Sequence, residues 1–313
     1  MPSRPRVRSL ARDWWLAAAV LTALRWVDVA GPIPMLQAGI VLVGLSLVPL
    51  LVLALALGAW RLAGATVALG VVHVALAVPW WVDSSVPPGE DDVVVAAANL
   101  EFGQGSVDDL AALAVEHDVD VLLLSEATPD TVAALDDSVL PDLLPHRTGS
   151  ARWDAGGTLV LTREPHDART ITEGFGFDQV VVEVDIEVGE GPLTVVGAHT
   201  FPPVGLTAQA WRSELEGLGG LLHGLPDGPL VVAGDLNTST GHPALRELLA
   251  EHDLAHAHRV AGEGWVRTWP RELPMPGFVQ IDHVLVRGLD VVEAGAWEIL
   301  GSDHLAVWAR LSP

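Results

Sequence analysis

Two short polar motifs flank apolar runs in the C-terminal third of the chain. The motif Gly234-Asp235-Leu236-Asn237 follows the apolar residues 230–233, and the motif Ser302-Asp303-His304 precedes the apolar residues 305–309. A buried strand needs no such polar groups to fold, and α/β folds place their chemistry where strands end. A carboxylate that activates water, together with an imidazole that faces developing negative charge, predicts hydrolysis of a phosphate ester.

Four further polar side chains stand at the ends of expected strands: Asn99, Glu126, His199 and Asp282. Phosphoryl hydrolysis needs a carboxylate that holds a divalent cation, a base for water and donors for the developing charge. Oxygen ligands of this kind suit Mg²⁺. A histidine held by a carboxylate keeps one tautomer and can be charged near neutral pH, and Asp282 with His304 is the expected pair of this kind.

Each of these residues, taken singly, also has a purely structural explanation. A lone aspartate at a strand end often caps a helix or forms a turn, so residues 235–238 can cap a helix that begins at Pro243. His199, which precedes residues 201–203, can be a packed turn residue. The occurrence of the whole set favours the functional interpretation.

The apolar pattern predicts an α/β fold after residue 92. Strands are expected at residues 93–100, 119–124, 158–161, 180–188, 193–198, 281–286, 291–297 and 305–311, and helices at 107–117, 206–222 and 243–252. This mixed order suits two packed sheets with helices outside. Residues 262–277, rich in Pro, Gly and Trp, are expected to form a loop beside the site.

The N-terminal residues 1–83 are expected to form a membrane region with three transmembrane helices, in residues 14–30, 29–60 and 62–82. A helix that crosses a bilayer takes about 20 apolar residues. Arginines at positions 4, 6, 8 and 12 would keep the N-terminus cytoplasmic. Three spans then place residues 93–313 outside the cell, after a linker at 84–92, whereas two spans would return this domain to the cytoplasm.

The composition disfavours nucleic acid as a partner. Seventeen basic residues against 40 acidic ones give a formal net charge of −23, which opposes attraction to DNA or RNA phosphates. An acidic, solvated surface explains this balance, and an acidic cleft would also attract divalent metal. Cysteine is absent, so the sequence excludes disulfides and thiolate metal sites.

The site residues, in their order and spacing, resemble the endonuclease/exonuclease/phosphatase superfamily, which has a DNase I-like fold. The resemblance covers about residues 93–311 and rests on Asn99, Glu126, His199 and the motifs Gly234-Asp235-Leu236-Asn237, Ile281-Asp282-His283 and Ser302-Asp303-His304. It implies a four-layer α/β sandwich with a Mg²⁺-dependent hydrolytic site, in which Mn²⁺ can substitute, at one end of the sheets.

The resemblance also implies a role for each matching residue. Glu126, Asn99 and Asp303 would lie at the metal, and Asp235 would position or deprotonate the attacking water. His304, oriented by Asp282, would stabilise the phosphorus centre, while Asn237 and His199 would contact the phosphate. Trp269 is expected near the substrate, with core or loop packing as the alternative, and Arg152 is expected to meet a phosphate.

Together these features predict a membrane-anchored phosphoesterase. The arrangement resembles actinobacterial members of the superfamily that join three N-terminal spans to this domain and are associated with lipid-linked pyrophosphates of the cell envelope. A phosphate ester or lipid pyrophosphate at the outer face of the membrane is therefore the expected substrate. The alternatives are an extracellular nuclease or phosphodiesterase and, less favoured, a non-catalytic tethered binding domain.

Overall fold

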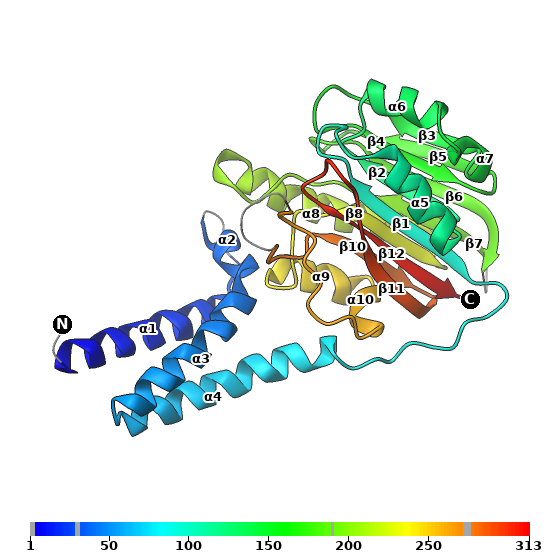
Figure 1. Cartoon of the computed structure of the whole chain (residues 1–313). Coiled ribbons are helices and arrows are strands. Elements are labelled where there is room, and N and C mark those ends of the chain that lie inside the picture. The colour runs from blue at the N-terminus through cyan, green and yellow to red at the C-terminus, as the bar shows by residue number, and fades with distance from the viewer. Residues whose placement is uncertain (1–3, 29–31, 189–190, 272–276) are drawn as a thin grey trace.

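The fold is built on two six-stranded mixed sheets, shown by a computed structural model that describes all residues except 1–3, 29–31, 189–190 and 272–276 (Figure 1). The first sheet has the order β11-β12-β1-β2-β4-β3, and the second has the order β5-β6-β7-β8-β10-β9. The strands are β1 Val93–Asn99, β2 Val121–Ser125, β3 His146–Ser150, β4 Thr158–Thr162, β5 His166–Ile171, β6 Gln179–Val188, β7 Gly191–Gly197, β8 Leu230–Asp235, β9 Ala255–His256, β10 Asp282–Arg287, β11 Asp290–Glu298 and β12 Leu305–Ser312.

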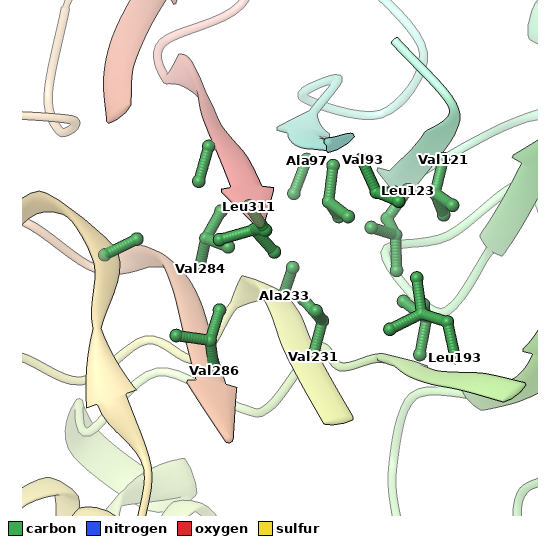
Figure 2. Packing of buried hydrophobic residues seen from close by; sticks show 14 of the residues in the cluster. Val93, Ala97, Val121, Leu123, Leu193, Val231, Ala233, Val284, Val286 and Leu311 are labelled. Carbon is green, nitrogen blue, oxygen red and sulfur yellow. The ribbon is translucent and has the colours of Figure 1, made fainter. Parts of the chain in front are cut away.

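Aliphatic side chains from both sheets fill the space between them. Figure 2 shows this core, in which Val93 and Leu123 of the first sheet face the same interior as Leu193, Val231 and Val284 of the second. The alternation of side chains along each strand places the other face of each sheet against helices. The expectation of two packed sheets inside helices is therefore confirmed.

Helices cover the outer face of each sheet. The first sheet carries α5 Val107–His117, α6 Pro129–Asp136 and α7 Leu140–Leu143, and the second carries α8 Ala208–His223 and α9 Pro243–Glu251. The short α10 Ala257–Val260 instead packs against the aliphatic core between the sheets. Ser106 accepts a hydrogen bond from Asp109 N at the start of α5, and Thr128 forms a capping box with Thr131 at the start of α6. These caps explain why both helices begin where they do.

The strand register gathers the expected site residues at one end of the sandwich. Asn99 pairs with Ser125 across the parallel strands β1 and β2, and Asp282 pairs with Asp235 across the antiparallel strands β10 and β8. Strand β12 starts at Leu305, directly after His304. We call this end of the sandwich the site end.

The N-terminal region forms α1 Arg4–Leu24, α2 Ile33–Ala38, α3 Ile40–Ala56 and α4 Trp60–Ala77, with α4 continued by a 3₁₀ turn, Val78–Trp80. Within the described residues, only the segment Trp60–Trp80 is long and apolar enough to cross a membrane, while Ile40–Ala56 is apolar but shorter. At about 1.5 Å per residue, the 17 residues of α3 extend roughly 25 Å, against a hydrocarbon core of about 30 Å.

The helices differ from the expected spans in two places. The apolar residues 29–60 contain a break at Gly39, which ends α2 and precedes α3, so they do not form one continuous helix. The first helix, α1, begins at Arg4 and ends at Leu24, so its first turns contain the arginines expected to precede the span at 14–30. These charged turns lower its hydropathy below that of a membrane span.

The helical region contacts the sandwich directly. Trp80 O accepts a hydrogen bond from Gly264 N at 2.6 Å, and Pro34 O lies 2.8 Å from His242 Nε2. Arg25 donates to Thr240 O at 2.6 Å. Residues 84–92, the expected linker, are also held, because Ser84 N donates to Val260 O at 2.8 Å and Val86 N to Val291 O at 2.9 Å.

Candidate active site

The end of β8 aims Asp235 and Asn237 into the site through two unusual backbone conformations. Gly234 has a φ of 135°, and a Cβ there would lie 2.1 Å from Ala198 O, so only glycine lets β8 approach this carbonyl. Asn237 has a φ of 46°, which non-glycine residues seldom adopt. Its N–H donates to Asp235 Oδ1 at 2.8 Å and its side-chain amide to Thr200 O at 2.9 Å. Such strain is typical of functional sites.

His304 is held by the facing strand. Its Nδ1 lies 2.9 Å from Asp282 Oδ2, and its Nε2 lies 3.8 Å from Asp235 Oδ2. Thr268 Oγ1 accepts a hydrogen bond from Asp282 N at 3.3 Å, while Ser302 Oγ accepts from His304 N at 3.0 Å and donates to Asn99 O at 2.7 Å. The imidazole therefore has a fixed orientation, with Nδ1 donating to Asp282 and Nε2 directed toward Asp235.

The buried charges raise two pKa values. Burial and the neighbouring charge of Asp282 raise the pKa of Asp235. Burial alone would lower the pKa of His304, but the carboxylates of Asp282 and Asp235 outweigh it and raise this pKa to about 10. His304 is therefore an imidazolium at neutral pH, which suits it to stabilise an oxyanion. The positive charge of His304 favours the ionised form of Asp235, and in that form it is a stronger base than an ordinary carboxylate, which suits it to accept a proton from water.

Asn99 joins Asp235 to Glu126. Its Nδ2 donates to Asp235 Oδ2 at 3.0 Å and to Glu126 Oε1 at 3.1 Å, and Phe102 N donates to Glu126 Oε2 at 2.9 Å. Burial raises the pKa of the Glu126 carboxyl. The Glu126 side chain is 13% exposed, against 1% for Asp235, so a solvated ion can approach it from outside.

Asp303 lies on the other side of His304. Its Oδ1 is 3.6 Å from His304 Nε2, and its Oδ2 accepts a hydrogen bond from Trp269 Nε1 at 2.8 Å. Its backbone N–H donates to Glu101 Oε2 at 2.8 Å. Trp269 therefore orients the Asp303 carboxylate at the edge of the cluster. The position of Trp269 in the sequence did not predict this contact.

The donor set fits a hard divalent cation. Asp235, Asp282 and Asp303 bring three carboxyl groups around the His304 imidazolium, and Asn99 links Glu126 to this group. Asp282 Oδ1 is buried without a hydrogen-bond partner among the described residues. Asp235, Asp282 and His304 present ligand atoms within 4.8 Å of one another. A cation is better held near Glu126 than near His304. Nδ1 of His304 is already engaged by Asp282, and the positive charge of the His304 ring repels a metal ion.

His199 lies beside the cluster as a neutral ring. Its Nε2 is 3.8 Å from Asp235 Oδ2 and 3.9 Å from Glu126 Oε1, and burial followed by the charge of His304 lowers its pKa to about 3. Phe177 stacks on the ring with centroids 4.2 Å apart. His199 can therefore donate or accept one hydrogen bond at Nε2 but does not supply a positive charge at neutral pH.

The structure brings together Asn99, Glu126, His199, Asp235, Asn237, Asp282, Asp303, His304 and Trp269. Arg152 is placed differently: its guanidinium pairs with Asp154 on its own loop at 2.9 Å, although its backbone N–H donates to Ala127 O beside Glu126. In this conformation the Arg152 guanidinium does not point to a phosphate site, because the carboxylate of Asp154 engages it. The expected contact of Arg152 with a phosphate stays a prediction.

Two supporting residues were missed by the sequence pattern. Phe177 stacks on His199, and the Gln179 side chain holds the backbone of His199 from both sides, accepting from His199 N at 3.1 Å and donating to His199 O at 2.6 Å. Neither residue belongs to a motif. The only signal was that both stand at the start of an apolar strand, where polar and aromatic side chains are common.

Comparisons with known proteins agree with this geometry. The profile of the endonuclease/exonuclease/phosphatase family matches residues 96–304. No curated protein matches the sequence. Among solved structures, an endonuclease/exonuclease/phosphatase from Beutenbergia cavernae DSM 12333 is 21% identical, with a TM-score of 0.56 over 71% of this chain and 72% of its own.

Two further solved structures have the same fold. TDP2 from D. rerio, humanized by 14 mutations, is 13% identical, with a TM-score of 0.55 over 72% of this chain and 100% of its own. Sphingomyelinase C from Streptomyces griseocarneus is 18% identical, with a TM-score of 0.50 over 71% of this chain and 99% of its own. At these identities the likeness shows the fold alone. The family match over more than half of the chain goes further, and it establishes that this chain belongs to the endonuclease/exonuclease/phosphatase family of metal-dependent phosphoric ester hydrolases.

Proposed function

We propose that this chain is a membrane-anchored, Mg²⁺-dependent phosphoesterase that hydrolyses a phosphate ester or pyrophosphate linked to a lipid, at the outer face of the membrane. The observation that carries the proposal is the contact between the apolar helices and the site end of the sandwich. His242, whose Nε2 lies 2.8 Å from Pro34 O before α3, is only five residues after Asn237. An anchor that joins the catalytic domain at its site end favours a substrate at the bilayer surface.

Exposed apolar side chains in the loops of the site end support the same orientation. They belong to the loops that follow β1, β3, β7 and β11, and they are Phe102, Trp153, Val204, Leu206 and Leu300. We call these five residues the apolar rim. A cluster of exposed apolar groups around a site is typical of a surface that contacts lipid or another protein.

The opposite end of the sandwich is acidic. Asp91, Asp92, Asp120, Glu164 and Glu187 line one depression there. Anionic headgroups would repel this end and would not repel the apolar rim, so electrostatics and apolar burial favour the same orientation. The overall net charge of −23 therefore does not oppose an anionic substrate at the other end, where His304 supplies positive charge and a divalent cation would add to it.

The residues of the site account for the steps of hydrolysis. Asp235 accepts the proton of the attacking water as its oxygen bonds to phosphorus, and Asn237 holds Asp235 in place through its backbone N–H at 2.8 Å. The P–O bond to the leaving group breaks with its electron pair on the leaving oxygen. His304, oriented by Asp282, faces the charge that develops on the phosphoryl oxygens. Glu126, Asn99 and Asp303 would hold Mg²⁺, which would supply Lewis-acid polarisation of the phosphate.

The arrangement in the membrane is proposed as multi-pass: α4 crosses alone by its length and hydropathy, and the shorter apolar helix α3 and the apolar part of α1 after Asp13 cross beside it. The N-terminal arginines then lie in the cytoplasm. An odd number of crossings places residues 93–313 outside. A C-terminal alkaline phosphatase reporter, active only outside the cytoplasm, should be active, and a C-terminal green fluorescent protein should be the weaker signal. The reverse pattern would reject the outer-face assignment.

A metal-supplemented substrate screen tests the activity. The full-length chain, with Mg²⁺ or Mn²⁺, is offered single-stranded DNA, a phospholipid, an inositol phosphate, bis-p-nitrophenyl phosphate and a polyprenyl pyrophosphate. We expect the lipid-linked substrates to have the highest kcat/KM, and Asp235→Asn and His304→Ala to lower kcat by roughly 10²–10⁴-fold. DNA is included because a D. rerio TDP2 structure holds a single-strand DNA product, and preferred turnover of DNA would favour the nuclease alternative.

A further inference from the structure

A large cavity lies between α3, α4 and the sandwich. Its volume is about 680 Å³, within the range of about 300–1,000 Å³ that is typical of small-molecule sites. Its long walls are aliphatic: α3 contributes Val41, Leu45 and Val48, and α4 contributes Val67, Val71 and Val74. We call this cavity the α3–α4 groove.

The groove changes character where it meets the sandwich. Its lining there includes Ser239, Thr240 and Gln280, together with the cationic side chain of Arg25, which donates to Thr240 O at 2.6 Å. A ligand that fits this lining has an apolar portion between the helices and a polar, anionic portion at the sandwich. A lipid phosphate or pyrophosphate has this distribution of charge.

The residues at the polar end of the groove are close in sequence to the catalytic residues. Ser239 is two residues from Asn237, and Gln280 is two residues from Asp282. Two residues of extended chain span at most about 7 Å, so the groove end is close to both. Contacts tie the two regions together, because Gln280 Nε2 donates to Asp282 O at 3.3 Å and His283, which lines the groove, lies 2.8 Å from Thr238 O.

We propose that the α3–α4 groove binds the hydrocarbon chain of the substrate while its phosphate lies at the Asp235–His304 site. This inference rests on the proposed function and deepens it, since it gives α3 and α4 two roles: they anchor the catalytic domain, and they bind the lipid part of the substrate. The enzyme then distinguishes long-chain from short-chain phosphates by a contact outside the catalytic cluster. The continuity of the groove with the segments that carry Asn237 and Asp282 favours the substrate over other occupants.

A glycine pair on α4 provides a matched test. Gly70 lines the groove and Gly64 does not, and no described atom lies within 4 Å of a Cβ built at either position. Gly70→Leu therefore fills the groove without a backbone clash, while Gly64→Leu makes the same change on the same helix elsewhere. Val71→Phe is a second groove-filling variant, for use if Gly70→Leu does not fold.

The full-length chain is reconstituted in phosphatidylcholine vesicles and assayed with a polyprenyl pyrophosphate and with bis-p-nitrophenyl phosphate. Gly70→Leu is expected to lower kcat/KM for the polyprenyl substrate at least tenfold and to leave hydrolysis of the soluble ester unchanged, which also reports folding. Gly64→Leu is expected to leave both unchanged. Equal long-chain activity in wild type, Gly70→Leu and Val71→Phe would overturn the inference and would mean that only bulk membrane lipid occupies the groove.

A crosslinking measurement separates this inference from the proposed function. A polyprenyl phosphate with a photoreactive group at the end of its chain is expected to label α3 or α4 in the wild-type chain and not in Gly70→Leu. If labelling occurs but the wild type hydrolyses no lipid phosphate, the proposed function fails and the groove assignment stands. If lipid phosphate is hydrolysed but both chains are labelled alike, or outside α3 and α4, the groove assignment fails alone.

Discussion

Nδ1 of His304 lies 2.9 Å from Oδ2 of Asp282, and both side chains are buried. This contact fixes the tautomer of the imidazole and keeps its Nε2 directed toward Asp235 Oδ2, 3.8 Å away. The two strands that carry Asp235 and Asp282 pair directly, so the register of one antiparallel ladder sets the positions of both acids. His304 comes from the other sheet, where it directly precedes β12.

Asp282→Asn should therefore impair catalysis without removing any group that meets the substrate. The amide does not hold the imidazolium, and the pKa of His304 should fall toward its ordinary value because one of the carboxylates that raise it is lost. We expect kcat to fall roughly 10²–10⁴-fold and the residual activity to be lost above a lower pH than in the wild type. The pH profile of kcat is the measurement. A profile with the same alkaline limit as the wild type would contradict an orienting role for Asp282.

Removal of the divalent metal should abolish activity. Dialysis against EDTA is expected to stop turnover of bis-p-nitrophenyl phosphate, and Mg²⁺ or Mn²⁺ should restore it, because the clustered carboxylates need a cation to neutralise them. Glu126→Gln should raise the Mg²⁺ concentration that gives half-maximal activity, with Glu116→Gln on the exposed face of α5 as the control. Turnover that survives EDTA would contradict the metal site.

The central strands could be predicted from the sequence, whereas two of the edge strands, β3 and β5, could not. Strands β1, β2, β8 and β10 are almost entirely buried, so their residues form continuous apolar runs. The edge strands β3 and β5 have mostly partly buried or exposed side chains and no apolar run. Polar residues at a sheet edge discourage pairing with other chains, and the same polarity removes the signal that a strand is present.

The groups that we assign to the chemistry were predictable because their types are unusual at the ends of buried strands. The contacts that hold these groups in place were not predictable, because the partners are distant in sequence. Trp269 reaches Asp303, 34 positions away, and Gln179 holds His199, 20 positions away. The break at Gly39 was also missed, because the hydropathy of residues 29–60 stays high across a change in chain direction.

The apolar rim should affect only substrates that are presented in a bilayer. The double variant Trp153→Ser/Leu206→Ser is expected to lower kcat/KM for a vesicle-bound substrate by about tenfold, since about 1.4 kcal/mol of lost apolar contact corresponds to that factor. Activity on soluble bis-p-nitrophenyl phosphate should not change. Val139→Ser is the control, because Val139 is exposed beside α7, outside the loops of the site end. A vesicle rate equal to that of the wild type would reject the membrane contact of these loops.

Stability should fall in mild acid because the fold buries histidines in their neutral form. Burial lowers the pKa of His258 to about 4, whereas the unfolded chain has an ordinary value of about 6.5. As the pH falls from about 6.5 to about 4, the unfolded state takes up a proton that the folded state does not, so the contribution to stability is present above this window and is lost within it.

His258→Gln isolates this effect, since glutamine can still donate to Gly295 O, which lies 2.9 Å from His258 Nε2. The variant should unfold at nearly the same temperature as the wild type at pH 7.5, and its thermal midpoint should fall less steeply between about pH 6.5 and pH 4. The measurement is the midpoint of thermal unfolding of the full-length chain in detergent. Parallel curves for the two chains would contradict this prediction. They would show that His258 takes up its proton equally in the folded and the unfolded state, although it is fully buried in the fold.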